Sequence, residues 1–108
     1  MARILPEPVS KLCYAHDGWI VGGAAKSESP KDYDVVIPFA RWAKAAMLIP
    51  RDAKANSFGG WKCVSEGVDL DVWPCDLAAL MKNAAVTDLW HPQSGARFAR
   101  LLPQSQNA

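Results

Sequence analysis

Glycine and proline positions divide the chain into short segments, and these breaks constrain its fold more than any other feature. They fall at Asp17-Gly18, Gly22-Gly23, Pro30, Pro38, Pro50 and Glu66-Gly67. Proline stops helices and glycine favours turns, so each segment between two breaks can form only a short helix or strand. One domain over residues 1–108 is therefore predicted, with 103–108 frayed at the end.

Residue patterns within the segments predict the type of each element. Apolar residues at helical spacing predict helices over 7–16 and 39–49, the second with the stripe Phe39, Trp42, Ala43, Ala46 and Ile49. Apolar, β-branched and aromatic runs predict strands over 19–21, 32–37, 61–65 and 68–73, with a turn at Glu66-Gly67 and a loop over 52–57. Asp76 is expected to cap a helix covering Leu77, Leu80, Met81 and Ala84, and 97–102 to form a last helical turn. This order favours an α+β fold, a small mixed β-sheet with helices packed on one face.

Composition excludes several classes of protein. Half of the residues are hydrophobic and 21% are charged, as in globular domains. The formal net charge of +1 gives no reason to expect nucleic-acid binding. No apolar run reaches the roughly 20 residues of a membrane helix, and the N-terminus lacks the apolar stretch of an export signal. We therefore expect a cytoplasmic protein without a membrane partner.

Three cysteines are an odd number, which favours reduced thiols over disulfides. Cys13 and Cys63 are expected in the core as small apolar residues. A zinc site formed by Cys13, His16, Cys63 and Cys75 is an alternative, although the second cysteine pair lacks the short spacing of a zinc knuckle.

Aspartates repeat at alternate positions on two predicted strands. Asp32 and Asp34 lie on the same face of one strand, and at roughly 3.3 Å per residue their Cα atoms are about 6.5 Å apart. Asp69 and Asp71 repeat this spacing on the other strand. If the two strands are neighbours, the carboxylates crowd together, and some of their pKa values should rise. Mg²⁺ or Mn²⁺ would relieve the repulsion, since hard divalent cations prefer carboxylate oxygens.

The pair Gly22-Gly23 ends a predicted strand nine residues before this acidic pair begins. Without Cβ atoms, its backbone can approach a phosphate group closely, and successive N–H groups can bind phosphate oxygens. A plain tight turn would have the same sequence. The spacing to Asp32 and Asp34 favours a phosphate-binding turn.

The stretches Ile20-Val21-Gly22-Gly23 and Lys31-Asp32-Tyr33-Asp34-Val35-Val36 together resemble the signature of the polymerase-β-type nucleotidyltransferase superfamily. The order of residues in this motif is most similar to that in the head domain of CCA-adding enzymes and poly(A) polymerases. The stretch from Ser57 to Lys62 and the stretch from Val68 to Pro74 resemble the third-acid strand of minimal stand-alone members. The resemblance covers roughly residues 18–80, and it implies a nucleotidyltransferase-like fold.

The resemblance implies a role for each matched residue. Asp32, Asp34 and Asp71 would be catalytic and bind two Mg²⁺ (or Mn²⁺) ions, with Asp69 as the competing third ligand. Gly22 and Gly23 would bind the phosphates of an NTP such as ATP, while position alone suggests Lys26 and Lys31 as further phosphate-binding residues. The implied activity transfers an NMP group from the NTP to a hydroxyl acceptor, on a small molecule or a protein, by a two-metal mechanism.

Other interpretations stay open at this point. The spacer between Gly23 and Asp32 is short for this superfamily, so the chain could instead be a catalytically inactive binding or regulatory module that acts through a protein partner. A helical protein partner and a homo-oligomer are both compatible with the sequence. Most of the five tryptophans are expected in the core, with base stacking as the alternative for Trp19, Trp61, Trp73 and Trp90. His91 is expected at the surface.

Overall fold

The computed structural model describes residues 4–27, 30–82 and 88–99. Its helices are α1 (Glu7–His16), α2 (Gly23–Lys26), α3 (Phe39–Ala45), the 3₁₀ turn η1 (Ala46–Leu48) and α4 (Leu77–Lys82). Its strands are β1 (Trp19–Val21), β2 (Asp32–Pro38), β3 (Lys54–Ala55), β4 (Trp61–Ser65), β5 (Val68–Cys75), β6 (Asp88–His91) and β7 (Ala96–Ala99).

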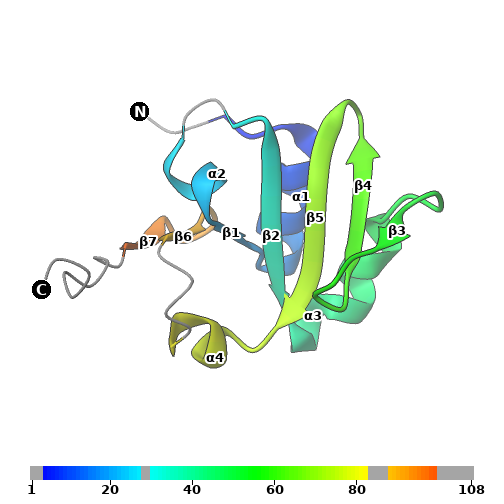
Figure 1. Cartoon of the computed structure of the whole chain (residues 1–108). Coiled ribbons are helices and arrows are strands. Elements are labelled where there is room, and N and C mark those ends of the chain that lie inside the picture. Colours follow the sequence, from blue (N-terminus) through cyan, green and yellow to red (C-terminus); the bar gives the residue numbers. More distant parts are fainter. Residues whose placement is uncertain (1–3, 28–29, 83–87, 100–108) are drawn as a thin grey trace, which may run out of the picture.

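All the described strands join one sheet in the order β3-β4-β5-β2-β1-β6-β7. The two long strands β2 and β5 run parallel in the middle of the sheet (Figure 1), while every other neighbouring pair is antiparallel. A parallel pair needs a crossover connection, and α3 belongs to the one between β2 and β5. The sheet is therefore mixed, as predicted.

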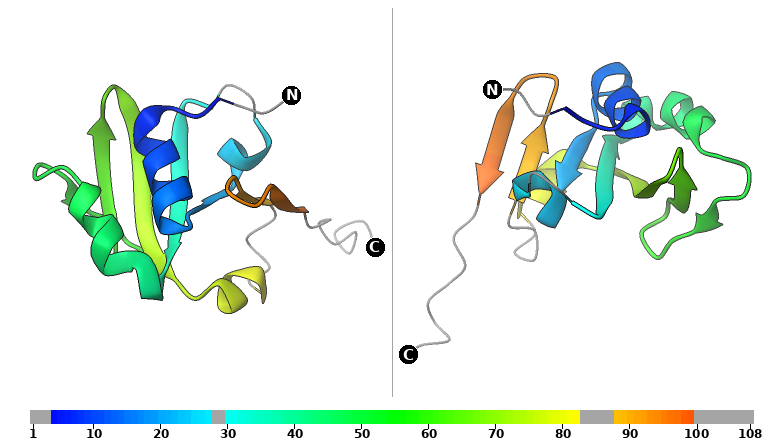
Figure 2. Two further views of the ribbon diagram at one scale, coloured as in Figure 1. Left: turned by 180° about the vertical axis from the view of Figure 1, so that it is seen from behind. Right: turned by 90° about the horizontal axis from the view of Figure 1, so that it is seen from above.

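One face of the sheet carries the main core, under α1 and α3. Alternate residues of β2 and β5 point to this face, including Val35 and Val72, which are fully buried. Val9 and Leu12 of α1 pack against them, so the predicted stripe of helix 7–16 is the buried one. Figure 2 shows α1 and α3 lying across the same side of β2 and β5.

The other face holds a smaller apolar cluster. It is formed by Val21, Val36 and Leu89 from the sheet and Leu80 from α4. The Asp76 carboxylate caps α4 by accepting a hydrogen bond from the N–H of Ala78 at 3.0 Å, as expected for this residue. The predicted α+β class is confirmed, and α4 adds a cluster on the second face.

The predicted helix over 39–49 has a different inner face. It consists of α3 followed by η1, and its buried residue is Ala45, whereas Phe39 is 64% exposed and Ala43 is also exposed. Trp42 and Ile49 of the predicted stripe do pack against the main core, and with Ala45 they form the buried stripe, whereas Phe39 and Ala43 lie outside it. Periodicity predicts a stripe here but does not select between two stripes related by a rotation of the helix.

The C-terminal prediction was wrong in the part of the chain that the structure describes. Residues 97–99 are not helical: β7 pairs with β6 in a hairpin, closed by a turn in which the N–H of Gly95 donates to the carbonyl of His91 at 2.7 Å. The left-handed φ of 79° at Gly95 suits such a turn. The predicted loop 52–57 also contains the short strand β3. Ala84 and residues 100–108 lie outside the described residues.

Among the described helices, none combines the length and the apolar character needed to cross a membrane.

Candidate functional site

The four aspartates singled out in the sequence lie together on β2 and β5. In the parallel register, Asp32 is opposite Asp69 and Asp34 is opposite Asp71. Tyr33 and Leu70, which alternate with them, are buried in the main core, so the aspartates point to the opposite face of the sheet. We call Asp32, Asp34, Asp69 and Asp71 the acidic patch.

Strand geometry sets the size of this patch. Neighbouring strands lie about 4.8 Å apart, and residues two apart on one strand are separated by about 6.6 Å. The aspartates therefore form two rows, one of Asp32 with Asp69 and one of Asp34 with Asp71. Asp32 and Asp69 are exposed, and Asp34 and Asp71 are half-buried.

Asp34 shows the electrostatic effect of this crowding. Burial raises the pKa of its carboxyl above the ordinary value of 3.8, and the negative charges of Asp71 and Asp32 raise it further. The Lys62 ammonium acts in the opposite direction, and the net shift remains upward. Negative charge at the centre of the patch is therefore incompletely neutralised by the protein itself.

Asp71 is held from the side of β4. Its Oδ2 lies 3.5 Å from the Lys62 ammonium, and its Oδ1 accepts a hydrogen bond from the Asn56 side-chain amide at 3.2 Å. The Lys62 side chain is 70% exposed, and exposed ion pairs contribute only about 0–1 kcal/mol. A divalent cation that bound Asp71 could thus displace Lys62 at small cost.

In the described part of the chain, no three His, Cys, Asp or Glu side chains are grouped so that they could hold a metal ion. Both oxygens of Asp71 have partners from the side of β4, away from β2. The donor set itself, carboxylates in two facing rows, suits a hard divalent cation. The register of β2 and β5 brings the four carboxylates to one face of the sheet.

The glycine turn lies beside the acidic patch. Gly22 follows β1 and has a φ of 71°, which L side chains rarely adopt. A Cβ atom at Gly22 would be 4.0 Å from Asp34 Oδ2, whereas one at Gly23 would meet nothing within 4 Å. The Gly22 N–H donates to the carbonyl of Asp88 at 3.0 Å. A ligand can therefore approach the backbone closely at the exposed Gly23. The Gly22 N–H is already used in a hydrogen bond to β6.

The two lysines suggested for phosphate binding are both exposed. Lys26, in the last turn of α2, lies 3.7 Å from a carboxylate oxygen of Asp88. Lys31 directly precedes Asp32 at the start of β2. The structure thus pairs Lys26 with β6, whereas Lys31 is near the acidic patch only through its position directly before Asp32.

Sequence reasoning missed Asn56 and Lys62 as members of the site. A signal for Lys62 existed: the turn at Glu66-Gly67 sets the β4–β5 register, which puts Lys62 opposite Asp71. No comparable signal pointed to Asn56, because it reaches Asp71 from a loop whose path depends on the tertiary structure.

His91 is buried, contrary to the expectation. Its Nε2 donates to Asp17 Oδ1 at 2.5 Å, its Nδ1 lies 2.6 Å from Ser94 Oγ, and its ring stacks on Trp19. Asp17 lies at the end of α1, so this network joins α1 to the β6–β7 hairpin. Both ring nitrogens of the buried imidazole are therefore hydrogen-bonded, which fits a role of His91 in holding the fold together.

The cysteines do not form the alternative zinc site among the described residues. Cys13 and Cys63 are buried in the main core, as expected, and Cys75 packs against the cluster on the other face. Burial raises the pKa of the Cys13 thiol to about 12. Cys13 is therefore a core residue and not a thiolate ligand.

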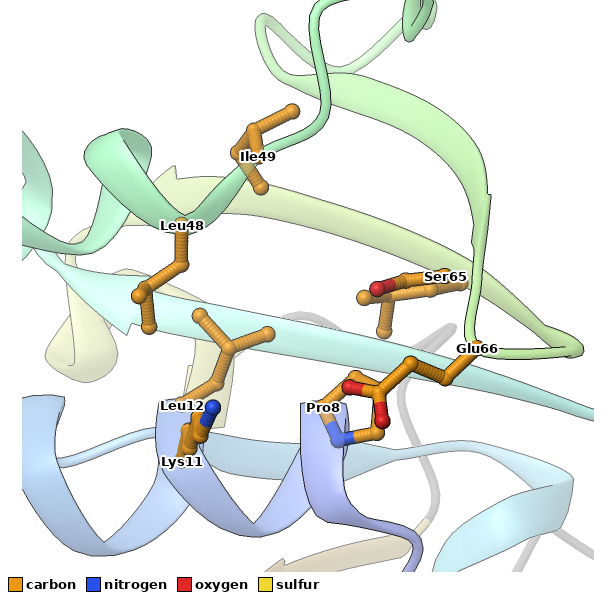
Figure 3. Close-up of a pocket in the computed structure, with 8 residues that line it drawn as sticks. Pro8, Lys11, Leu12, Leu48, Ile49, Ser65 and Glu66 are labelled. Atoms are coloured by element: carbon orange, nitrogen blue, oxygen red, sulfur yellow. The ribbon is translucent and has the colours of Figure 1, made fainter.

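The cavity in Figure 3 lies on the other side of the sheet from the acidic patch. It is formed between α1, η1 and the β4–β5 turn, and its volume is about 80 Å³. Ligand pockets usually measure about 300–1,000 Å³. Nearer the patch, a shallower depression of about 250 Å³ is lined by Lys54, Lys62, Val64 and Asp69 among others.

Comparisons with known proteins give no further guide: no family model matches the chain, and no curated protein or solved structure matches it significantly.

Proposed function

We propose that this protein is a minimal nucleotidyltransferase, which transfers an NMP group from an NTP to a hydroxyl acceptor with the help of divalent cations. The observation that supports this most is the register of β2 and β5, which places Asp32 and Asp34 directly opposite Asp69 and Asp71. The resemblance of the glycine pair and the acid-x-acid motif to the polymerase-β-type superfamily points the same way. We also propose that the protein acts in the cytoplasm.

Asp32, Asp34 and Asp71 would hold Mg²⁺ or Mn²⁺, with Asp69 available as a further ligand. A pair of such ions neutralises phosphate charge and orients the attacking and leaving oxygens. The protein contributes the fixed rows of carboxylates; burial of Asp34 and repulsion from Asp71 and Asp32 raise the pKa of its carboxyl, which favours an added cation. The half-buried position of Asp34 strengthens its attraction to a cation, since water screens it less.

Phosphate groups of the NTP would lie against the Gly22-Gly23 turn. A Cβ atom at Gly22 would lie 4.0 Å from Asp34 Oδ2 and one at Gly23 would meet nothing within 4 Å, so a phosphate beside this turn would lie close to a cation held by Asp34. Lys31 is placed to offset phosphate charge from the start of β2. By the family resemblance, Asp71, which lies opposite Asp34, would help to take the proton of the acceptor hydroxyl once it is released from Lys62.

Thermal unfolding with ATP or CTP and Mg²⁺ tests this proposal. A ligand that binds only the folded state stabilises it by RT ln(1 + [L]/Kd), about 2.7 kcal/mol at a hundredfold excess over Kd. For a domain of this size, the Tm should rise by about 4–8 °C for each kcal/mol. We expect this rise in the wild type and not in Asp32→Asn/Asp34→Asn.

A control is the variant Glu7→Gln, which removes an exposed carboxylate of α1, on the other face of the sheet from the patch. It should keep the full ligand-induced rise. If the wild type shows no rise with any NTP and Mg²⁺, the proposal is wrong. The alternative, an inactive module that acts through a protein partner, would then be favoured.

A further inference from the structure

An aromatic pair continues the face that carries the acidic patch. Trp73 follows Asp71 by two residues on β5, so both point to the same side of the sheet. Phe58 packs on Trp73 with ring centroids 4.9 Å apart and an interplanar angle of 32°. Trp73 is half-buried, whereas Phe58 is 60% exposed. An aromatic ring is thus presented to solvent directly beyond the second row of aspartates.

Asn56 ties this pair to the patch. Its Oδ1 accepts hydrogen bonds from the backbone N–H groups of Phe58 at 3.0 Å and Gly60 at 2.8 Å. Its Nδ2 donates to Asp71 Oδ1. The same side chain therefore shapes the loop that carries Phe58 and holds a carboxylate of the patch.

Gly60 fixes the height of this loop above the sheet. A Cβ atom at residue 60 would lie 1.9 Å from the Val72 carbonyl oxygen and 2.6 Å from Trp73 Cα. Only glycine permits the loop backbone to approach β5 so closely. The close approach of the backbone at Gly60 to β5 therefore helps to position Phe58 over Trp73.

The distances fit an extended nucleotide. Along β2 and β5, the Asp32–Asp69 row, the Asp34–Asp71 row and the Val36–Trp73 row follow at steps of about 6.6 Å, so the first and third are about 13 Å apart. The glycine turn lies near the first two rows and the aromatic pair at the third. A nucleoside triphosphate has its phosphates and its base at opposite ends of one chain.

We propose that Phe58 and Trp73 form the platform on which the base of the bound nucleotide stacks. This inference rests on the proposed function, because it assumes that the triphosphate lies at the acidic patch. Stacking uses the face of a base and not its edges, so the platform would accept different bases and favour the larger purines.

Binding of two ligands separates the platform from the metal site. With Mg²⁺ present, isothermal titration measures the affinity of the protein for ATP and for inorganic tripolyphosphate, which lacks the nucleoside. Phe58→Ala should weaken ATP binding by about 5- to 150-fold, the effect of one lost stacking contact, and leave tripolyphosphate binding unchanged. Phe58→Trp should restore ATP affinity.

Phe39→Ala is the matched control, because Phe39 is similarly exposed, at 64%, but belongs to α3. It should change neither affinity. Unchanged tripolyphosphate binding also shows that Phe58→Ala is folded.

The outcomes are distinguishable. If the wild type binds tripolyphosphate with Mg²⁺ and Phe58→Ala binds ATP as tightly as the wild type, the platform is refuted and the proposed function stands. If the wild type binds neither ligand, the proposed function fails and the platform fails with it.

Discussion

At the residue scale, Asp34 is where the site and the stability of the protein oppose each other. Its carboxyl is half-buried between two other carboxylates, and Lys62 offsets only part of their repulsion. The ionised form is therefore less favourable in the folded chain than in the unfolded one. Such a cost is typical of side chains kept for binding, since a cation would remove it.

We expect Asp34→Asn to stabilise the metal-free protein at neutral pH. A carboxyl whose pKa is raised on folding contributes stability that is present below its unfolded value, near 3.8, and lost as pH rises through the folded pKa. Asparagine has no such loss, so the gain over the wild type should vanish toward pH 3.8. Urea unfolding in EDTA across this range measures it.

Addition of Mg²⁺ should reverse the order of stability at neutral pH, with the wild type gaining and Asp34→Asn unchanged. A variant that is less stable than the wild type in EDTA at pH 7 would show that burial and repulsion of the ionised Asp34 carboxyl do not destabilise the folded protein.

Gly60 provides a second prediction at this scale. Gly60→Ala places a methyl group 1.9 Å from the Val72 carbonyl oxygen, so the loop must move away from β5. We expect a loss of about 1–3 kcal/mol in the free energy of unfolding, the usual cost of overpacking. Gly23→Ala, where the added methyl group meets nothing within 4 Å, is the control for adding a side chain and should cost much less.

At the scale of elements, the β6–β7 hairpin is the part of the fold that the sequence patterns did not predict. Its strands are short, and β6 begins directly after residues outside the described part of the chain. The hairpin is held by contacts from distant segments: Asp17 bonds to His91, and the Arg97 guanidinium donates to the Ala25 carbonyl at 2.9 Å and lies over the Trp90 ring. These interactions come from segments far away in the sequence, and local strand propensity does not reflect them. The hairpin therefore forms because of its tertiary contacts.

His91→Ala should therefore loosen this hairpin. The change leaves the Asp17 carboxylate without its partner and opens space beside Trp19, and we expect a loss of about 1–3 kcal/mol. Hydrogen exchange should quicken first in β6 and β7. His16→Ala, at the half-buried end of α1, is the control. Equal exchange rates in His91→Ala and the wild type would contradict the role given to the network.

For the whole molecule, the two faces of the sheet explain what the sequence could predict. Period-two alternation in β2 and β5 predicted the shared face of the aspartates on each strand, since this pattern is local to the strand. That the two strands are parallel neighbours was only a condition of the hypothesis, because pairing depends on the crossover through α3. The Glu66-Gly67 turn could have indicated the contact of Lys62 with Asp71, whereas the contact of Asn56 depends on the loop between β3 and β4 and followed from no motif.

The outer strand beyond β4 has a consequence for how copies of this protein meet. β3 is two residues long, and both residues, Lys54 and Ala55, are exposed. Brevity and a lysine are features by which sheet proteins prevent another chain from adding a strand at an open edge. Growth of the sheet from one molecule into the next is therefore disfavoured on this side, which protects concentrated solutions against aggregation by strand addition.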